Sequence, residues 1–184
     1  TASILDLGEK MSTIEKLREQ GLTVYLMEWK APQLEQSTIG LDDYLDQSLH
    51  RCVNRVLEDC QLDKVNLMGV CQGGVLSLCY ASLYPGNIRT LIPVVTPVDC
   101  HTKEDTLSSL ARYLDLEALG LSGLNIPGVL LAQVFLSLKP MTLTIKKYLD
   151  IAEHITESED CSELTKKFMA MEQWVEKTPD QPAQ

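Results

Sequence analysis

The feature that most constrains this chain is an apolar run that breaks at a glycine, passes one cysteine and two more glycines, and continues with helical composition. Residues 65–75 read V-N-L-M-G-V-C-Q-G-G-V, which predicts a strand, a sharp turn and a helix. The stretch has the form G-x-C-x-G, the nucleophile-elbow pattern with cysteine in place of serine. The tip of such a turn takes a strained backbone, and glycines let the flanking strand and helix approach each other. We therefore expect Cys71 to point outward, no room for a side chain at Gly69 or Gly73, and Gly74 to belong to the same elbow.

The position of Cys71 before a helix suggests its chemistry. The first N–H groups of a helix have no partner within that helix, and together with the helix dipole they favour negative charge, here the nucleophilic thiolate. The backbone N–H of Gln72 is then the first donor of an oxyanion hole for a tetrahedral intermediate. A thiol nucleophile suits a thioester substrate, because thioester exchange keeps the acyl group activated. The alternative is a buried structural cysteine, but the glycine spacing and the strand-to-helix context favour the nucleophile.

Composition excludes several classes of protein. The chain has 184 residues and 45% hydrophobic content, enough for one globular domain. Its formal net charge of −10 predicts neither nucleic acid nor an anionic membrane surface as a partner. The six cysteines could form three disulfides, but the sequence shows no signal peptide, so we expect a reducing, cytoplasmic environment. Without a C-x-x-C pair, and with three scattered histidines, no metal site is expected.

Before the elbow, the sequence predicts a helix, a strand and a second helix. The S-x-x-E pattern of residues 12–15 is typical of a capping box, and the helix should end at Gly21. Residues 22–29 are almost continuously apolar, which predicts a central parallel strand covered on both faces. Apolar residues recur at every third and fourth position of residues 41–60, which predicts an amphipathic helix. Its opposite face is expected to be solvated: Asp42, Asp46, His50, Arg51, Asn54 and Glu58.

After the elbow, residues 75–84 should form a helix that ends at Pro85-Gly86. Residues 88–95 follow as another strand and close a strand–helix–strand unit. Pro93 within that run favours a sheet edge or a local bulge, since proline cannot donate to a sheet ladder. Residues 96–101 then come at the carboxyl end of the strand, where open parallel sheets place their sites.

Beyond about residue 103 the strand pattern stops and helical segments are expected. Residues 129–138 are strongly apolar but shorter than the roughly 20 residues that cross a bilayer, so no transmembrane segment is predicted. Residues 143–155 and 164–175 are two further amphipathic segments.

The alternation of helix and strand around a cysteine elbow is typical of an α/β hydrolase. Several stretches further resemble the catalytic subunit of class III polyhydroxyalkanoate synthases, two-component bacterial enzymes that polymerise 3-hydroxyacyl groups from coenzyme A thioesters. The resemblance covers essentially the whole chain: residues 21–26, 41–44, 62–74, 96–99, 125–128, 138–140 and 171–174. It implies an α/β fold, with an incomplete α/β-hydrolase-like parallel sheet and flanking helices over residues 1–102, and a truncated helical cap, or lid, over residues 103–184.

The same resemblance implies a role for Cys71 as the nucleophile that takes a (R)-3-hydroxyacyl group, with 3-hydroxybutyryl-CoA as the expected substrate. Coenzyme A would leave, and the acyl group would pass to a hydroxyl of the growing polyester chain. Implied partners are a second copy in a homodimer, an accessory synthase subunit and the surface of a polyhydroxyalkanoate granule in the cytoplasm; no cofactor is implied. The family's catalytic aspartate and histidine cannot be carried over onto any residue here, so the chain resembles a synthase fragment or a truncated homologue that is inactive alone.

Asp99 and His101 lie at the right edge of the predicted sheet to be considered as an internal acid and base. A base must reach the nucleophile while the acid holds its other nitrogen, and two residues so close in sequence are poorly placed for both tasks. A structural turn or cap role is therefore favoured for Asp99. Two other functions stay open: a thiol esterase or dienelactone-hydrolase-like enzyme, and a non-catalytic dimerisation or granule-binding module.

Overall fold

The computed structural model describes residues 2–8, 11–30, 33, 39–99, 102, 108, 112–113, 125–138, 141–157 and 161–176. The chain divides into two compact units. One, here called the sheet unit, is Thr38–Glu117, and the other, the helical unit, combines Thr1–Ser37 with Ala118–Ala183. The elbow lies within the sheet unit.

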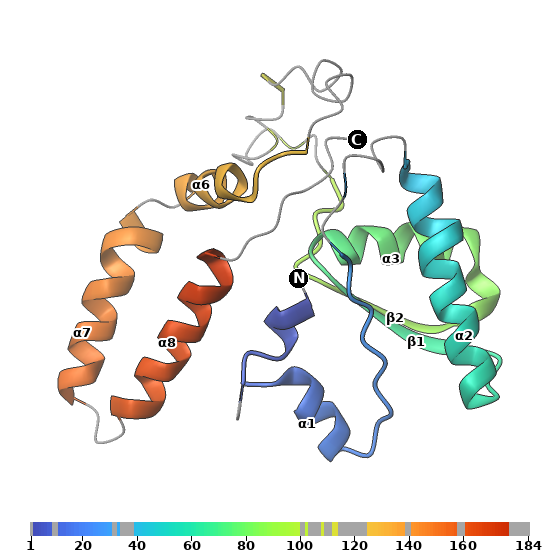
Figure 1. Ribbon diagram of the computed structural model, residues 1–184, viewed down its shortest axis with the longest axis horizontal. Helices are drawn as coiled ribbons and strands as arrows, with labels where there is room; N and C mark the ends of the chain where they lie inside the picture. The colour runs from blue at the N-terminus through green and yellow to red at the C-terminus, as the bar shows by residue number, and fades with distance from the viewer. Residues whose placement is uncertain are drawn as a thin grey trace. The chain divides into compact units, whose positions relative to one another are not determined.

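Two parallel strands joined by a helix form the centre of the sheet unit (Figure 1). The elements are β1 (Val65–Val70), α3 (Gln72–Leu83), a 3-10 turn at Pro85–Asn87 and β2 (Ile88–Val94). The predicted strand–helix–strand unit is thus confirmed. Pro93 lies opposite Gly69 in the ladder, and the one register irregularity falls at the other end, between Val65 and Asn66. The bulge predicted at Pro93 is therefore not found, and its position on an edge of this two-stranded sheet is the alternative that holds.

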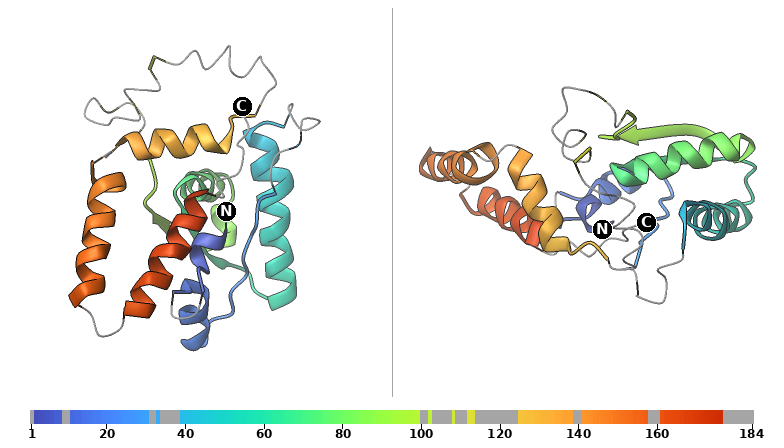
Figure 2. Two further views of the ribbon diagram at one scale, coloured as in Figure 1. Left: turned by 60° about the vertical axis from the view of Figure 1, so that its left-hand side comes forward. Right: turned by 90° about the horizontal axis from the view of Figure 1, so that it is seen from above.

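A long helix precedes β1, as the periodicity of residues 41–60 predicts. Its first part, η3 (Asp43–Leu49), is wound as a π-helix, and it continues as α2 (His50–Cys60). The apolar stripe supplies most of the buried core: Leu45, Leu49 and Val53 are each at most 7% exposed. These residues face the strand–helix–strand unit, since η3 contacts α3 and α2 contacts β1. Figure 2 shows α2 and α3 on the same side of the two strands.

The central strand predicted at residues 22–29 is wrong. The chain forms no strand there. Four of its large apolar side chains are exposed: Leu22, Tyr25, Leu26 and Trp29. An apolar run becomes a buried strand only where a neighbouring strand completes its backbone hydrogen bonds and helices cover its faces. In the described part of the chain the sheet consists of β1 and β2, and residues 22–29 belong to the helical unit instead.

In the helical unit, the serine half of the predicted capping box is present: the Ser12 hydroxyl accepts a hydrogen bond from the Glu15 N–H at 2.9 Å. The helix it starts ends before Gly21, which has a φ of 78°. The described elements of this unit are η1 (Ala2–Leu5), α1 (Thr13–Glu19), α6 (Gly128–Leu138), η5 (Met141–Lys146), α7 (Lys147–Glu157) and α8 (Cys161–Glu176).

Helices α7 and α8 pack against each other as a pair. Lys147 and Tyr148 on α7 both bind Glu172 on α8, at 2.6 and 2.9 Å, and the Tyr148 ring meets the edge of Phe168. The described elements after residue 103 are helices, as predicted, while the division into core and cap at residues 102 and 103 stays a prediction. None of the described helices is both long and apolar enough to cross a membrane.

Candidate active site

The turn between β1 and α3 places Cys71 at the tip of a strained, exposed elbow. Its φ and ψ are 54° and −119°, a left-handed conformation that residues other than glycine rarely adopt. The turn is held from both sides. The Cys71 N–H donates to the Val94 carbonyl of β2 at 2.9 Å, and the Cys71 carbonyl accepts from Gly74 and Val75 at 2.9 and 3.3 Å. The thiol is exposed, so the alternative of a buried structural cysteine does not fit this geometry.

Two backbone donors lie next to the thiol at the start of α3. No described residue accepts a hydrogen bond from the N–H groups of Gln72 or Gly73. No side chain caps the helix start either. These N–H groups and the positive end of the helix dipole are therefore available to an oxyanion formed on an acyl group at Cys71.

The glycines of the elbow have different steric roles. A Cβ at Gly69 would meet the backbone of Gly73, with the carbonyl carbon 2.6 Å away, and the Ser77 hydroxyl. A Cβ at Gly74 would lie 2.9 Å from both Cβ and Cγ2 of Thr96. A Cβ at Gly73 would meet nothing within 4 Å. The expectation of close approach holds at Gly69, but at Gly73 it is wrong, because α3 turns that position outward and brings Gly74 against the segment after β2.

Within the sheet unit, the structure does not bring a described histidine to the elbow. Asp99 is exposed in the segment after β2, and His101 lies outside the described residues. His50 is held elsewhere: its ring stacks on Tyr84 at a centroid distance of 4.0 Å. Tyr84 follows the last residue of α3, about 20 Å along the helix from Cys71 at 1.5 Å per residue.

The carboxyl half of α3 carries a polar cluster in which the buried Tyr80 is central. The Asn54 amide donates to His50 Nε2 at 3.0 Å, so His50 Nδ1 carries the proton and donates to the Tyr80 hydroxyl at 3.1 Å. The Asn87 amide donates to the same hydroxyl at 3.1 Å. Burial raises the pKa of Tyr80, and the Asn87 hydrogen bond opposes that rise in part.

Tyr84 extends this cluster toward the surface. Its hydroxyl donates to the Asp46 carboxylate at 2.6 Å. That hydrogen bond is the main cause that raises the pKa of Tyr84, with burial second. Asp46, His50 and Asn54 are therefore not a purely solvated face, as the helical periodicity suggested. Asp46 and His50 bind Tyr84 and Tyr80 at the end of α3, and Asn54 binds His50.

In the part of the chain that the structure describes, no three His, Cys, Asp or Glu side chains come together as a metal site would need.

Sequence reasoning missed the role of the segment after β2. Thr96 packs on Gly74, and its hydroxyl donates to the Val94 carbonyl at 3.3 Å, the same carbonyl that receives the Cys71 N–H. The T-P-V-D sequence of residues 96–99 was the available signal, but nothing in it indicates this contact.

Comparison with known proteins bears on this elbow directly. Residues 6–120 match the family described as the alpha/beta hydrolase fold. The chain belongs to the α/β-hydrolase family. It is also a homologue of the poly(3-hydroxyalkanoate) polymerase subunit PhaC, being 41% identical to the Allochromatium vinosum protein over 96% of this chain and 48% of that protein.

Other PhaC relatives match over similar ranges. The PhaC of a Synechocystis strain is 37% identical over 97% of this chain and 48% of that protein, and the Haloferax mediterranei PhaC is 32% identical over 94% and 35%. This α/β hydrolase chain therefore spans about half the length, or less, of these relatives. No solved structure matches it significantly. The resemblance to polyhydroxyalkanoate synthases seen in the sequence is confirmed.

Proposed function

We propose that this chain carries the nucleophile of an acyltransferase that polymerises (R)-3-hydroxyacyl groups from coenzyme A thioesters, with 3-hydroxybutyryl-CoA as a substrate. The observation that supports this most is the exposed Cys71 at the tip of the elbow, beside two backbone N–H groups without a described acceptor. The homology to PhaC supplies the substrate class.

The proposed reaction has two acyl transfers. In the first, the Cys71 thiolate attacks the thioester carbonyl, and the oxyanion accepts hydrogen bonds from the Gln72 N–H and the neighbouring Gly73 N–H. The intermediate collapses, the carbon–sulfur bond to coenzyme A breaks, and the acyl group stays on Cys71 as a new thioester. In the second, the hydroxyl of another hydroxyacyl unit attacks this thioester, an ester forms, and the thiol of Cys71 is regenerated.

Each transfer needs a base, first for the thiol and then for the attacking hydroxyl. The described histidine His50 is bound to Asn54 and Tyr80 and is remote from Cys71. We therefore place the acid and base in the half of a PhaC-like domain that this chain does not match, and the chain alone should not turn over. Asp99 keeps its proposed structural role, and His101 is not assigned to catalysis.

A chimera tests the proposal, with residues 1–184 replacing the matched segment of the Allochromatium vinosum PhaC. With 3-hydroxybutyryl-CoA, the chimera should release coenzyme A and form polymer. Cys71→Ala should abolish both, by about 10³-fold or more, because no other group can carry the acyl chain. Cys79→Ala is the matched control: this second cysteine of α3 is half-buried, and its removal should leave both rates within about twofold.

Three outcomes would contradict the proposal. Polymer formation by the Cys71→Ala chimera would exclude Cys71 as the nucleophile. Release of free hydroxy acids without polymer would favour the thiol esterase or dienelactone-hydrolase-like alternative. Sustained, Cys71-dependent coenzyme A release by residues 1–184 alone would show that the chain supplies its own base.

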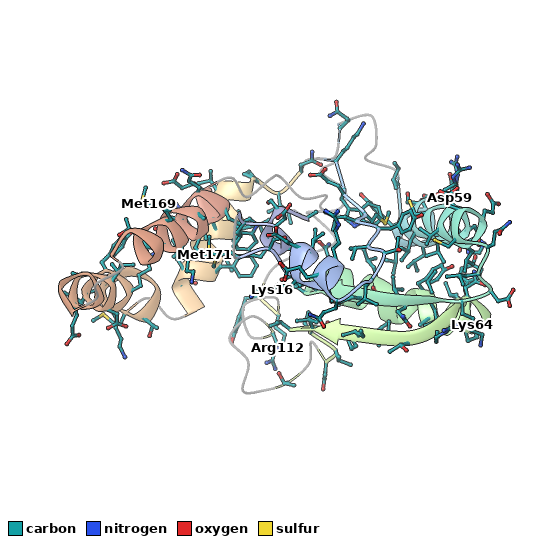
Figure 3. The ribbon with its side chains drawn as sticks, turned by 90° about the horizontal axis from the view of Figure 1, so that it is seen from below. Lys16, Asp59, Lys64, Arg112, Met169 and Met171 are labelled. Carbon is teal, nitrogen blue, oxygen red and sulfur yellow. The ribbon has the colours of Figure 1, made fainter. Side chains whose placement is uncertain are left out.

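The helical unit is proposed to meet an apolar partner: the granule surface, a second copy or the accessory subunit. Large apolar side chains on α6, η5, α7 and α8 are more than half exposed, namely Val129, Leu130, Met141, Ile145, Leu149 and Met169. Figure 3 shows Met169 and Met171 on α8. A non-catalytic role as a dimerisation or granule-binding module would be favoured if Cys71→Ala left the cellular effect of the protein unchanged.

A further inference from the structure

Val95 and Cys71 are the residues that directly follow the last paired residues of the two strands. The register pairs Val70 with Val94, so the next residues of the two strands are Cys71 and Val95. The Cys71 N–H donates to the Val94 carbonyl at 2.9 Å, which places the Val95 backbone directly beside the elbow.

The conformation of Val95 is costly and its side chain is not used by the core. Its φ is 48°, in a region where a β-branched residue is a rare outlier, and the residue is 82% exposed. The turn itself has a structural purpose, because it carries Thr96 onto Gly74. However, glycine or asparagine would make the same turn with less strain. The turn therefore explains the backbone conformation and leaves the valine side chain unexplained.

We propose that Val95 is a specificity-determining residue: its side chain contacts the acyl chain carried on Cys71 and sets the preferred length of that chain. The inference rests on the proposed function, because it assumes an acyl group on Cys71. Strained residues that persist without a packing role are concentrated at functional sites. An exposed isopropyl group on the residue after the Val94 carbonyl that binds the Cys71 N–H gives an aliphatic acyl chain an apolar surface to cover. That contact removes apolar area from water on both sides.

The test uses thiol alkylation of the full chain, which needs no acyltransferase activity. The probes are N-alkyl iodoacetamides from methyl to hexyl; each forms a carbon–sulfur bond, iodide leaves, and buffer takes the thiol proton. Rates at individual cysteines are read by peptide mass spectrometry, with Cys52, exposed on α2, as internal reference. The hexyl-to-methyl rate ratio at Cys71 should exceed that at Cys52 by roughly tenfold, the effect of covering about two methylene groups.

Val95→Asn should reduce that ratio at Cys71 to the Cys52 value, while Val95→Ile should preserve it. Asparagine tolerates the left-handed backbone, so the loss would reflect the apolar side chain and not the turn. The matched control is Gln61→Asn, which makes a similar change at another exposed residue with positive φ, 53°, at the end of α2. It should leave the ratio at Cys71 unchanged.

A Cys71 ratio equal to that of Cys52 in the parent chain would overturn the inference, and so would a ratio that survives Val95→Asn or is lost equally in Gln61→Asn. These failures are separable from failure of the proposed function. If the chimera showed no acyl transfer but the alkylation ratio depended on Val95, the polymerase proposal would be contradicted and the apolar contact at Cys71 would be retained. If the chimera transferred acyl groups but the ratio did not depend on Val95, only the role of Val95 would be contradicted.

Discussion

At its amino end, α3 starts from a cysteine with φ of 54°, an exposed thiol and two N–H groups without a described acceptor. At its carboxyl end, the same helix carries Tyr80 at 0% exposure, with two side chains bound to its hydroxyl. Among the described residues, no buried side-chain nitrogen or oxygen lacks a hydrogen-bond partner. The amino end of α3 thus has a strained residue and backbone N–H groups that a ligand could bind. At the carboxyl end, the polar side chains bind one another and hold the neighbouring helices together.

The amino end tolerates its strain because backbone contacts, and not side chains, fix it. Gly69 lets the strand approach the first turn of α3, and Gly74 admits Thr96 from the segment after β2. Cys71 is therefore positioned by two glycine contacts and by the hydrogen bond of its N–H to Val94. The two ends of α3 can therefore be compared by adding single methyl groups at the amino end and removing a single hydroxyl group at the carboxyl end.

The largest effect is expected for Gly69→Ala. The new methyl group would lie 2.6 Å from the Gly73 carbonyl carbon and would also meet the Ser77 hydroxyl. Because the Gly73 atoms are backbone and cannot rotate away, β1 and α3 must move apart. We expect a loss of about 3 kcal/mol, the upper end of overpacking costs. Gly73→Ala is the matched control, since its methyl group meets nothing within 4 Å and should stabilise the helix by up to about 1 kcal/mol.

Hydrogen exchange on peptides that cover β1 and α3 measures both changes, because it reports the local opening free energy of this unit. Gly74→Ala should fall between the two, since Thr96 is a side chain that can shift. If Gly69→Ala and Gly73→Ala changed protection by the same amount, the close approach of strand and helix at Gly69 would be refuted.

A smaller loss is expected at the other end of α3 for Tyr80→Phe. The substitution keeps the ring but leaves His50 Nδ1 without the hydroxyl that it binds, at a cost of about 1–3 kcal/mol. Ser82→Ala, at an exposed position of the same helix, is the control and should stay within about 0.5 kcal/mol. Chemical unfolding followed by far-ultraviolet circular dichroism gives the values. Alkylation of Cys71 should be unaffected, and a parallel loss of both would contradict the independence of the two ends.

The sequence predicted the structure of the amino end of α3 better than that of its carboxyl end. G-x-C-x-G is a local pattern, so the strand, turn and helix of residues 65–83 follow from it. The cluster around Tyr80 joins residues up to 41 positions apart, from Asp46 to Asn87, and no local period indicates that His50 and Asn54 face another helix. The wrong strand at residues 22–29 has the same cause, because composition cannot supply the neighbour that a strand requires.

The prediction that Gly73 has no room for a side chain was wrong because the sequence pattern does not give side-chain directions. The pattern names the glycines but not the direction in which each Cβ would point, and a shift of one residue on a helix turns that direction by about 100°. Val95 lay beyond any sequence signal, since an exposed valine is ordinary and only its φ of 48° distinguishes it.

The smallest expected effect is on how folding stability decreases at alkaline pH. The pKa values of Tyr80 and Tyr84 are both raised, the first mainly by burial and the second mainly by its hydrogen bond to Asp46. These tyrosines stay protonated in the folded chain after they have ionised in the unfolded chain, so the unfolded state binds fewer protons. Their contribution is fully present below about pH 10, the ordinary tyrosine pKa, and is lost as the pH rises through the folded values.

Thermal midpoints measured from about pH 9 to about pH 11 should therefore fall less steeply in Tyr84→Phe than in the parent chain, because the variant has one fewer group that ionises on unfolding. Tyr113→Phe removes a tyrosine that is 90% exposed and should leave the slope unchanged. Since Cys71 lies at the opposite end of α3, its alkylation profile against pH should be the same in both variants. A Tyr84→Phe slope equal to that of the parent would mean that Asp46 does not hold this hydroxyl in solution, and a shifted Cys71 profile would mean that the two ends of the helix are electrostatically linked.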